Sequence, residues 1–349
     1  MDNATQETPL ISVVMSVYNN IDYIEKAVAS ILAQSYEHFE FLIFDDGSTD
    51  GTRAKLQQYA QQDPRIKLTL NEENRGLLPN LNAGLEQASG EYIARMDGDD
   101  YSFPDRFKKQ VHLLKTRAEI VLVGTGYFTI DNKDRRYKLT IEASEAWEVY
   151  WINLFRPVLM HPSAMFRTNL LTEHGLRYKD DMFPAEDFDM WSRMAAYGEI
   201  HVIQEPLIEY RLHDNNISAT KFEAQMAKTA EIVTNNIQRE FPDLAKHYAR
   251  DLLGTMNVLF THHYLTAKDF DSATRLFNAL LDSVTKTKQL NVKSQQQLKQ
   301  LAARWLLKGW LRSKKQKLAG ALKLRSFYQP IGREVLQIIK RHMKNAHVE

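Results

Sequence analysis

The first 130 residues of the chain alternate short apolar runs with segments of helical periodicity, and this alternation restricts the fold more than any other feature. The apolar runs read as short buried strands. They cover residues 10–17, 39–44, 66–70, 92–96 and 120–124. Helical segments cover residues 21–33, 52–62 and 77–88, and a further helix begins at Pro104. This order predicts an α/β fold with a mainly parallel sheet and helices on both faces.

The rest of the chain has a different pattern. Residues 140–211 are mixed, with a strand-like segment at 201–203, and after Ser218 the pattern is almost entirely helical. A length of 349 residues favours roughly two domains. We therefore expect an α/β domain over residues 1–218 and an all-helical C-terminal region over residues 219–349.

Composition excludes several classes of protein. Apolar and charged fractions of 44% and 26% are those of a soluble globular protein. No run approaches the roughly 18 apolar residues of a membrane-spanning helix, and the start has no basic-then-apolar signal sequence. The chain has no cysteine, so neither disulfides nor thiolate chemistry contribute. These features together predict a cytoplasmic protein.

Charge is distributed unevenly along the chain. From Lys286 to the end there are 16 Lys and Arg against 2 Asp and Glu, whereas the preceding part has 29 against 42. A basic terminal segment predicts an anionic partner, and we expect membrane lipid rather than nucleic acid because no nucleic-acid motif accompanies the charge. Residues 298–312 have amphipathic helical spacing, which fits either a helix in the membrane interface or one whose apolar side packs in a helical bundle.

Three carboxylates follow the fourth predicted strand, at Asp97, Asp99 and Asp100. Such a cluster is costly unless a cation neutralises it, and in open α/β sheets ligands bind at the carboxyl ends of strands. A tight turn at Gly98 would let Asp97 and Asp99 reach one divalent ion. The alternative is a solvated acidic turn in which Asp100 caps the next helix.

Several motifs occur in an order that resembles glycosyltransferase family 2. The N-terminal ones are Ile11 to Asn19, Asp45 to Thr52, Asn74 to Leu77, Asp97 to Asp100 and Pro104 to Arg106. The later ones are His161 to Arg167, Glu186 to Trp191 and Tyr210 to His213. The resemblance covers about residues 9–218 and implies the Rossmann-like GT-A fold and a nucleotide-diphosphate sugar as donor.

The resemblance also implies roles for individual residues on the donor side. Asp99 is expected to bind Mg²⁺ or Mn²⁺ directly, while Asp97 binds the metal through water or contacts the ribose. His213 would add an imidazole to the metal or to the diphosphate, although a lone histidine is more often packed or solvated. Ser16 and Tyr18, at the end of the first strand, would hold the base.

Two further residues on the donor side have alternative interpretations. Asp46 could accept hydrogen bonds from the base or ribose, but a carboxylate in this position also forms turns and caps helices. Arg75 could pair with phosphate or base, or it could simply be solvated.

The acceptor side is expected to supply a base. Inverting transfer requires a carboxylate opposite the leaving group to take the proton of the acceptor hydroxyl. The family pattern assigns this role to Asp187, with Glu186 positioning the acceptor or a loop and His161 on the acceptor-side wall. The alternative is that both carboxylates complement the dipole of a helix N-terminus.

The predicted function is therefore that of an inverting, metal-dependent hexosyltransferase with a hydroxyl acceptor, a UDP-sugar being the favoured donor. Family habit and the basic tail suggest a saccharide or lipid-linked acceptor and a role in bacterial surface polysaccharide or lipopolysaccharide synthesis, peripheral on the inner face of the cell membrane. A non-catalytic scaffold that kept the fold is one alternative. A nucleotidyltransferase is another, although its usual Gly- and Lys-rich first loop is absent.

Overall fold

The computed structural model describes residues 8–213, 216–260, 267–312 and 334, and the chain divides into two compact units, Met1–Phe222 and Glu223–Glu349. The first unit contains a nine-stranded mixed sheet, and the second is helical. Within the described residues no helix is both long enough and apolar enough to span a membrane.

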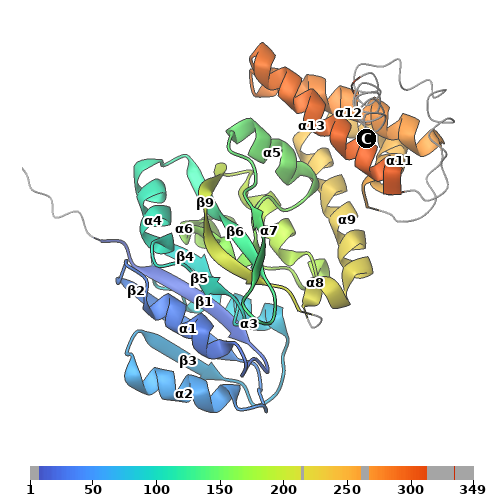
Figure 1. Cartoon of the computed structure of the whole chain (residues 1–349). Coiled ribbons are helices and arrows are strands. Elements are labelled where there is room, and N and C mark those ends of the chain that lie inside the picture. Colours follow the sequence, from blue (N-terminus) through green and yellow to red (C-terminus); the bar gives the residue numbers. More distant parts are fainter. Residues whose placement is uncertain (1–7, 214–215, 261–266, 313–333, 335–349) are drawn as a thin grey trace, which may run out of the picture. The chain divides into compact units, whose positions relative to one another are not determined.

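The first half of the sheet has the predicted β-α order (Figure 1). Its strands are β1 (Ile11–Val17), β2 (Phe39–Asp45), β3 (Ile66–Leu70) and β4 (Tyr92–Arg95). They pair in parallel in the order β3-β2-β1-β4. The helices between them are α1 (Ile24–Leu32), α2 (Thr52–Gln62) and α3 (Leu77–Gln87). These boundaries agree with the predicted ones to within three residues, which confirms the parallel part of the prediction.

The second half of the sheet is mixed. It continues in the order β8 (Met165–Arg167), β6 (Ile120–Ile130), β9 (Glu199–Arg211) and β5 (Tyr101–Ser102), and β7 (Arg136–Thr140) pairs with β6. Because β8 is antiparallel to both β4 and β6, strands β6 and β9 run in the same direction as β1 to β4. Most strands therefore point the same way, as predicted, although the predicted segment at 201–203 is only a short piece near the start of a thirteen-residue strand.

The remaining elements of the first unit surround this half of the sheet. The helices are α4 (Arg106–Thr116), α5 (Ala146–Phe155), α6 (Asn169–His174), α7 (Glu186–Met194) and α8 (Ile217–Thr220). Single 3₁₀ turns lie at His161–Ser163 and Asp180–Met182. Helix α4 begins two residues after Pro104, which is therefore outside the helix.

Both faces of the sheet are covered by helices because side chains alternate along each strand. Val13 and Met15 of β1 belong to one apolar cluster with Val28 of α1 and Phe107 of α4. Val14 points to the opposite face, where a Cβ atom on Gly84 of α3 would lie 2.4 Å from its Cγ1 atom. A helix residue larger than glycine at position 84 would therefore push α3 away from the sheet.

Where the structure describes the second unit, it forms helices. They are α9 (Phe222–Glu240), which starts one residue before the unit boundary, α10 (Pro242–His247), α11 (Ala249–Phe260), α12 (Ala267–Thr287) and α13 (Val292–Arg312). Helices α11, α12 and α13 pack against one another. On α13, Leu298, Ala302 and Leu306 are buried while Arg304 and Lys308 are exposed. The apolar side of the predicted amphipathic helix therefore packs in protein. Most of the basic tail beyond it lies outside the described residues.

Candidate active site

The carboxylate loop Asp97–Asp100 lies directly after β4, at the carboxyl edge of the parallel strands. Gly98 is buried against the end of β1, and a Cβ atom there would lie 2.9 Å from Asn20 Nδ2 and 3.1 Å from Val17 Cγ2. A larger residue at this position would require the Asn20 and Val17 side chains to shift, because the loop approaches β1 closely. The loop is thus fixed beside the strand end at which Ser16 and Tyr18 lie.

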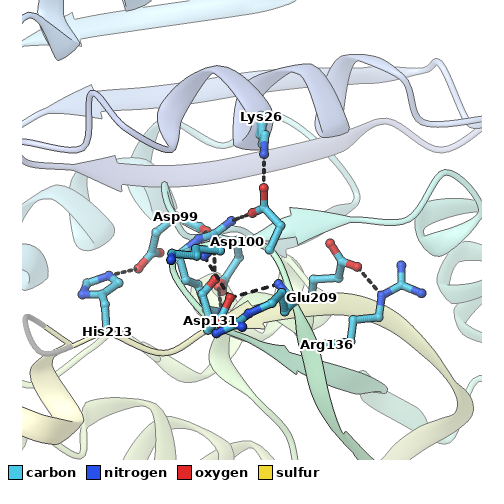
Figure 2. Close-up of polar contacts among 11 residues, drawn as sticks. Lys26, Asp99, Asp100, Asp131, Arg136, Glu209 and His213 are labelled. Carbon is cyan, nitrogen blue, oxygen red and sulfur yellow. Dashed lines mark hydrogen bonds and ion pairs between the residues drawn. The ribbon is translucent and has the colours of Figure 1, made fainter.

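Asp99 and His213 meet at this edge, as Figure 2 shows, with His213 Nε2 2.9 Å from Asp99 Oδ2. The ring of Tyr23 stacks on His213 with centroids 5.7 Å apart. Both groups are partly exposed, so a ligand could reach the two atoms. The structure therefore brings together two of the three predicted metal ligands.

Arg211 holds this pair in place. Its side chain is buried and donates from Nε to the Asp99 carbonyl oxygen (2.9 Å), from Nη1 to the Asp131 carbonyl oxygen (2.7 Å) and from Nη2 to Asp134 (2.6 Å). Its backbone N–H donates to Asp100 Oδ1 at 2.8 Å. One arginine therefore connects the carboxylate loop with the turn between β6 and β7.

Asp100 is buried and its second carboxylate oxygen has no hydrogen-bond partner among the described residues. Burial and the neighbouring charges of Asp99 and Asp97 raise its pKa well above the usual value. A buried, unpaired carboxylate oxygen attracts a cation or a proton, which fits a cation site in this loop better than a solvated acidic turn.

Asp97, the third predicted ligand, forms an ion pair with Arg95. Arg95 is fully buried, and its guanidinium also donates to the carbonyl oxygens of Val14 (2.8 Å) and Met96 (2.6 Å). Its Nε donates to His161 Nε2 at 3.0 Å. Asp97 is thus held by a cation of the protein.

His161, for which the acceptor-side wall was predicted, is a hydrogen-bond partner of Arg95 in the structure, and its place on an acceptor wall stays a prediction. It is buried, its Nε2 lies 2.9 Å from the Tyr178 hydroxyl, and burial beside Arg95 lowers its pKa well below the usual value. Because Arg95 can only donate, Nε2 carries no proton, and the imidazole is neutral. His161 therefore orients Arg95, and through Arg95 it supports Asp97.

Glu186 and Asp187 form the start of α7, directly after a cis Phe183–Pro184 bond and Ala185. Burial raises the pKa of Asp187 to about 6, although the backbone N–H of Phe188 donates to its Oδ1 at 2.7 Å. Burial and the charge of Asp187 raise the pKa of Glu186 to about 8, and Glu186 Oε2 is buried with no hydrogen-bond partner among the described residues. Asp187 therefore accepts one N–H group of the first turn of α7, as the helix-terminus alternative expects, whereas Glu186 Oε2 has no such donor among the described residues.

The two groups of carboxylates interact electrostatically through Asp97. Its negative charge raises the pKa of both Glu186 and Asp187, and the neighbouring charge of Asp99 raises that of Asp97. Arg95 acts on all of them in the opposite direction. The loop after β4 and the start of α7 therefore belong to one site.

Three of the residues predicted to bind the nucleoside, Ser16, Tyr18 and Asp46, lie at the ends of β1 and β2, and Arg75 lies in the loop before α3. Asp46 is buried, and its carboxylate accepts hydrogen bonds from the backbone N–H groups of Arg75 and Gly76 (both 2.9 Å) and from Asn71 Nδ2 (3.0 Å). This carboxylate holds the loop before α3, which agrees with the turn-forming alternative, and a contact with the base or ribose stays a prediction. The Arg75 side chain is exposed.

Ser16 and Tyr18 flank the last residue of β1, and Tyr18 has an exposed ring. The backbone N–H of Asp46 donates to the Val17 carbonyl at 2.8 Å, so the two strand ends are joined. An exposed aromatic ring here could stack on a base.

A metal ion fits this donor set. Within the described part of the chain no three His, Asp or Glu side chains converge on one point. Two side chains do come together, with Asp99 Oδ2 and His213 Nε2 2.9 Å apart, and the unpaired Asp100 oxygen lies in the same loop as Asp99. Carboxylate oxygen and imidazole nitrogen suit Mn²⁺ and, with oxygen ligands added, Mg²⁺. The remaining ligands would be phosphate oxygens and water.

The sequence reasoning missed Arg95 and Tyr178, which are both fully buried and polar. For Arg95 a signal existed, since it is a charged residue at the end of the apolar run Tyr92-Ile93-Ala94. For Tyr178 there was none, because its partners are distant in the sequence.

Comparisons with known proteins agree on one family. The model of the family described as glycosyl transferase family 2 matches residues 12–175. A putative teichuronic acid biosynthesis glycosyltransferase of Bacillus subtilis, TuaG, is 35% identical over 239 residues, which are 67% of this chain and 91% of TuaG.

Two solved structures share the fold. Staphylococcus aureus TarS 1–349 in complex with UDP-GlcNAc has a TM-score of 0.57 at 17% identity, covering 87% of this chain and 88% of TarS 1–349. The mannosyltransferase PcManGT of Pyrobaculum calidifontis, in complex with GDP-Man and Mn²⁺, has a TM-score of 0.50 at 18% identity and covers 88% of each chain. The chain therefore has the predicted GT-A fold and belongs to glycosyltransferase family 2.

Proposed function

We propose that this chain is an inverting, metal-dependent glycosyltransferase that moves a hexose from a nucleotide-diphosphate donor to a hydroxyl acceptor. The observation that supports this most strongly is the pairing of two kinds of carboxylate in one site. Asp99 with His213 suits a cation on the leaving group, whereas Asp187 has a raised pKa and suits a proton acceptor.

Asp99 and His213 would hold Mn²⁺ or Mg²⁺, with Asp100 beside them. When bound, the ion neutralises negative charge that develops on the departing diphosphate. Asp97, fixed by Arg95, would face the ribose or a water of the metal shell. Ser16, Tyr18, Asp46 and Arg75 would contact the nucleoside and the phosphates in this proposal.

Asp187 performs the proton step. The acceptor hydroxyl oxygen attacks the anomeric carbon and forms the new glycosidic bond while its proton passes to Asp187. The bond from the anomeric carbon to the diphosphate breaks, and its electron pair leaves with the nucleoside diphosphate. Glu186 keeps its proton at neutral pH and can donate a hydrogen bond to a sugar hydroxyl.

The related proteins support the setting of this reaction. TuaG is a putative glycosyltransferase of teichuronic acid biosynthesis, and TarS binds UDP-GlcNAc. We accordingly propose a saccharide or lipid-linked acceptor in surface polysaccharide synthesis and favour a UDP-sugar. PcManGT binds GDP-Man, so thermal stabilisation by UDP-GlcNAc and by GDP-mannose should be compared with and without Mn²⁺.

We further propose that residues 1–218 carry the catalytic machinery and that residues 219–349 hold the enzyme at the membrane. The basic segment after residue 285 would contact the anionic inner face of a cell membrane. Its exposed cations Arg304 and Lys308 support this proposal.

The test is Asp187→Asn. Loss of the base should lower kcat by roughly 10²- to 10⁴-fold, while nucleotide binding changes less than about twofold, since Asp187 does not contact the nucleotide in this proposal. In the unsubstituted enzyme kcat/KM should rise with pH through an apparent pKa of about 6, because only the ionised carboxylate accepts a proton.

The matched control is Asp181→Asn, an exposed aspartate just before the same helix. It should leave kcat and the pH profile unchanged. Equal loss of transfer and of nucleotide binding in Asp187→Asn would remove Asp187 from the role of base.

A further inference from the structure

The turn between β6 and β7, with β7 itself, exposes large apolar side chains beside basic ones. We call residues 131–141 the β6–β7 tip. Its apolar side chains are Tyr137, Leu139 and Ile141, with exposed fractions of 58%, 52% and 39%. Exposed apolar residues are normal when scattered singly, but three within five positions form a patch that water solvates poorly.

The tip is basic as well as apolar. It carries Lys133, Arg135, Arg136 and Lys138 against Asp131 and Asp134. Arg135 pairs with Asp131, and Arg136 pairs with Glu209 of β9 while its guanidinium lies over the Phe128 ring. Lys133 and Lys138 are exposed. The surface thus offers positive charge next to apolar side chains.

The tip lies beside the candidate active site. Figure 2 draws Asp131 between the Asp99–His213 pair and the Arg136–Glu209 pair. The Arg211 side chain binds the tip through Asp131 and Asp134 and binds the carboxylate loop through the Asp99 carbonyl. Lys26 of α1 also pairs with Asp134, so the tip is anchored on two sides. Its position relative to Asp99 and His213 is therefore fixed.

Pairing with a second copy of the chain explains this surface poorly. Strand β7 pairs with β6 alone in the described sheet, so one edge is open. That edge carries Lys138, and β7 has one residue more than β6 at the register shift between Thr129 and Ile130. Lysine and bulges are the devices by which proteins prevent strands from adding to an open edge.

We propose that the β6–β7 tip binds the surface of an anionic lipid bilayer. Lys133 and Lys138 would contact lipid phosphates while Tyr137, Leu139 and Ile141 enter the interface, where aromatic and aliphatic side chains are favourable. We favour anionic lipid as the partner because its negative charge complements the exposed lysines of the tip. The proposed function explains only why such a surface lies at the active site, since it would bring a lipid-linked acceptor to Asp187. Binding to lipid can be measured without any transfer.

The absence of cysteine allows a direct test on the full chain. Tyr137→Cys, labelled with an environment-sensitive fluorophore, should show a blue shift and increased emission with phosphatidylcholine vesicles that contain about 30 mole per cent phosphatidylglycerol. Pure phosphatidylcholine vesicles should produce no change. The same label on Tyr197→Cys, a 46% exposed tyrosine just before the start of β9, at the end of that strand away from the tip, should stay unchanged with both.

A pair of matched variants tests the energetics by vesicle sedimentation. Lys138→Glu with Leu139→Ser should weaken binding to the anionic vesicles roughly tenfold. Lys115→Glu with Tyr197→Ser removes a cation and a large apolar side chain outside both the tip and the basic segment, and it should change binding less than about twofold. Circular dichroism melting checks that all variants are folded.

Three results would overturn the proposal. The first is an unchanged label at position 137 while the protein sediments with anionic vesicles, which would assign lipid binding to the basic tail. The second is an equal response to neutral vesicles. The third is a label change without vesicles that follows protein concentration, which would identify a second copy as the occupant. Transfer to a water-soluble acceptor should survive Lys138→Glu with Leu139→Ser, so failure of this inference is distinguishable from failure of the proposed function.

Discussion

Glu40 and Glu186 are equally buried, each with 5% of its surface exposed, yet they lie in opposite electrostatic environments. Burial opposes ionisation of Glu40, but hydrogen bonds from Lys67, Ser12 and Ser89 outweigh it and lower its pKa to about 2. Burial and the charge of Asp187 raise the pKa of Glu186 to about 8. The protein therefore provides donors to one buried carboxylate and withholds them from the other.

We propose that this difference separates carboxylates that hold the fold from those that would bind a ligand. Glu40 ties β2 to β1 through Ser12, to β3 through Lys67 and to the end of α3 through Ser89. Asp46 also accepts three hydrogen bonds from the protein, and with about four acceptor sites on its two oxygens it can still accept one from a nucleoside. Glu186 Oε2 and Asp100 Oδ2 have no such partner within the described ranges. We infer that each of these two oxygens is satisfied by a hydrogen bond from substrate, by a cation or by a proton that it carries itself.

The largest expected effect is on Glu186. Its folded pKa lies above its unfolded value, so the folded protein loses stability as pH rises from about 4.5 to about 8. Glu186→Gln removes this loss. The stability of the variant relative to the original protein should therefore increase by about 3 kcal/mol between about pH 5 and about pH 8, measured by urea unfolding. A difference independent of pH would mean that Glu186 is not buried as a neutral acid.

Glu40→Gln should have the opposite sign. The folded pKa of Glu40 lies below its unfolded value, so its stabilisation is present above about pH 4.5 and is lost as pH falls toward about 2. At pH 7 the substitution should destabilise the protein by about 2 kcal/mol, a figure reduced because Lys67 is 59% exposed. Urea unfolding at about pH 7 and about pH 3 checks it. Equal destabilisation at both would exclude the ionised carboxylate as the cause.

The electrostatic environments of Glu40 and Glu186 could not be predicted from the sequence around each residue. The strands β1 to β4 were predictable because periodicity within five to eight residues specifies them. Glu40 is visible as a charged residue between Phe39 and Phe41, but its donors come from three other segments. The three-residue strand β8 is too short to carry a pattern, and its antiparallel insertion breaks the parallel order. The positions of Asp99, His213 and Asp187 followed from motif order, whereas the arginines that fix the carboxylate loop required the structure.

The smallest effect concerns His213, which sharpens the comparison on the ligand side. Asp99 and His213 are partners of each other in the structure, and a cation would replace that contact by binding both. His213→Ala removes one donor and leaves Asp99, so Mn²⁺ affinity in the presence of nucleotide should fall about tenfold, equivalent to about 1.4 kcal/mol. Titration followed by Mn²⁺ electron paramagnetic resonance measures this. His174→Ala, an exposed histidine stacked on Tyr197, is the control and should not change Mn²⁺ affinity. An unchanged Mn²⁺ affinity in His213→Ala would show that His213 is not a metal ligand. Its imidazole would then only orient Asp99, as Lys67 and Ser12 hold Glu40.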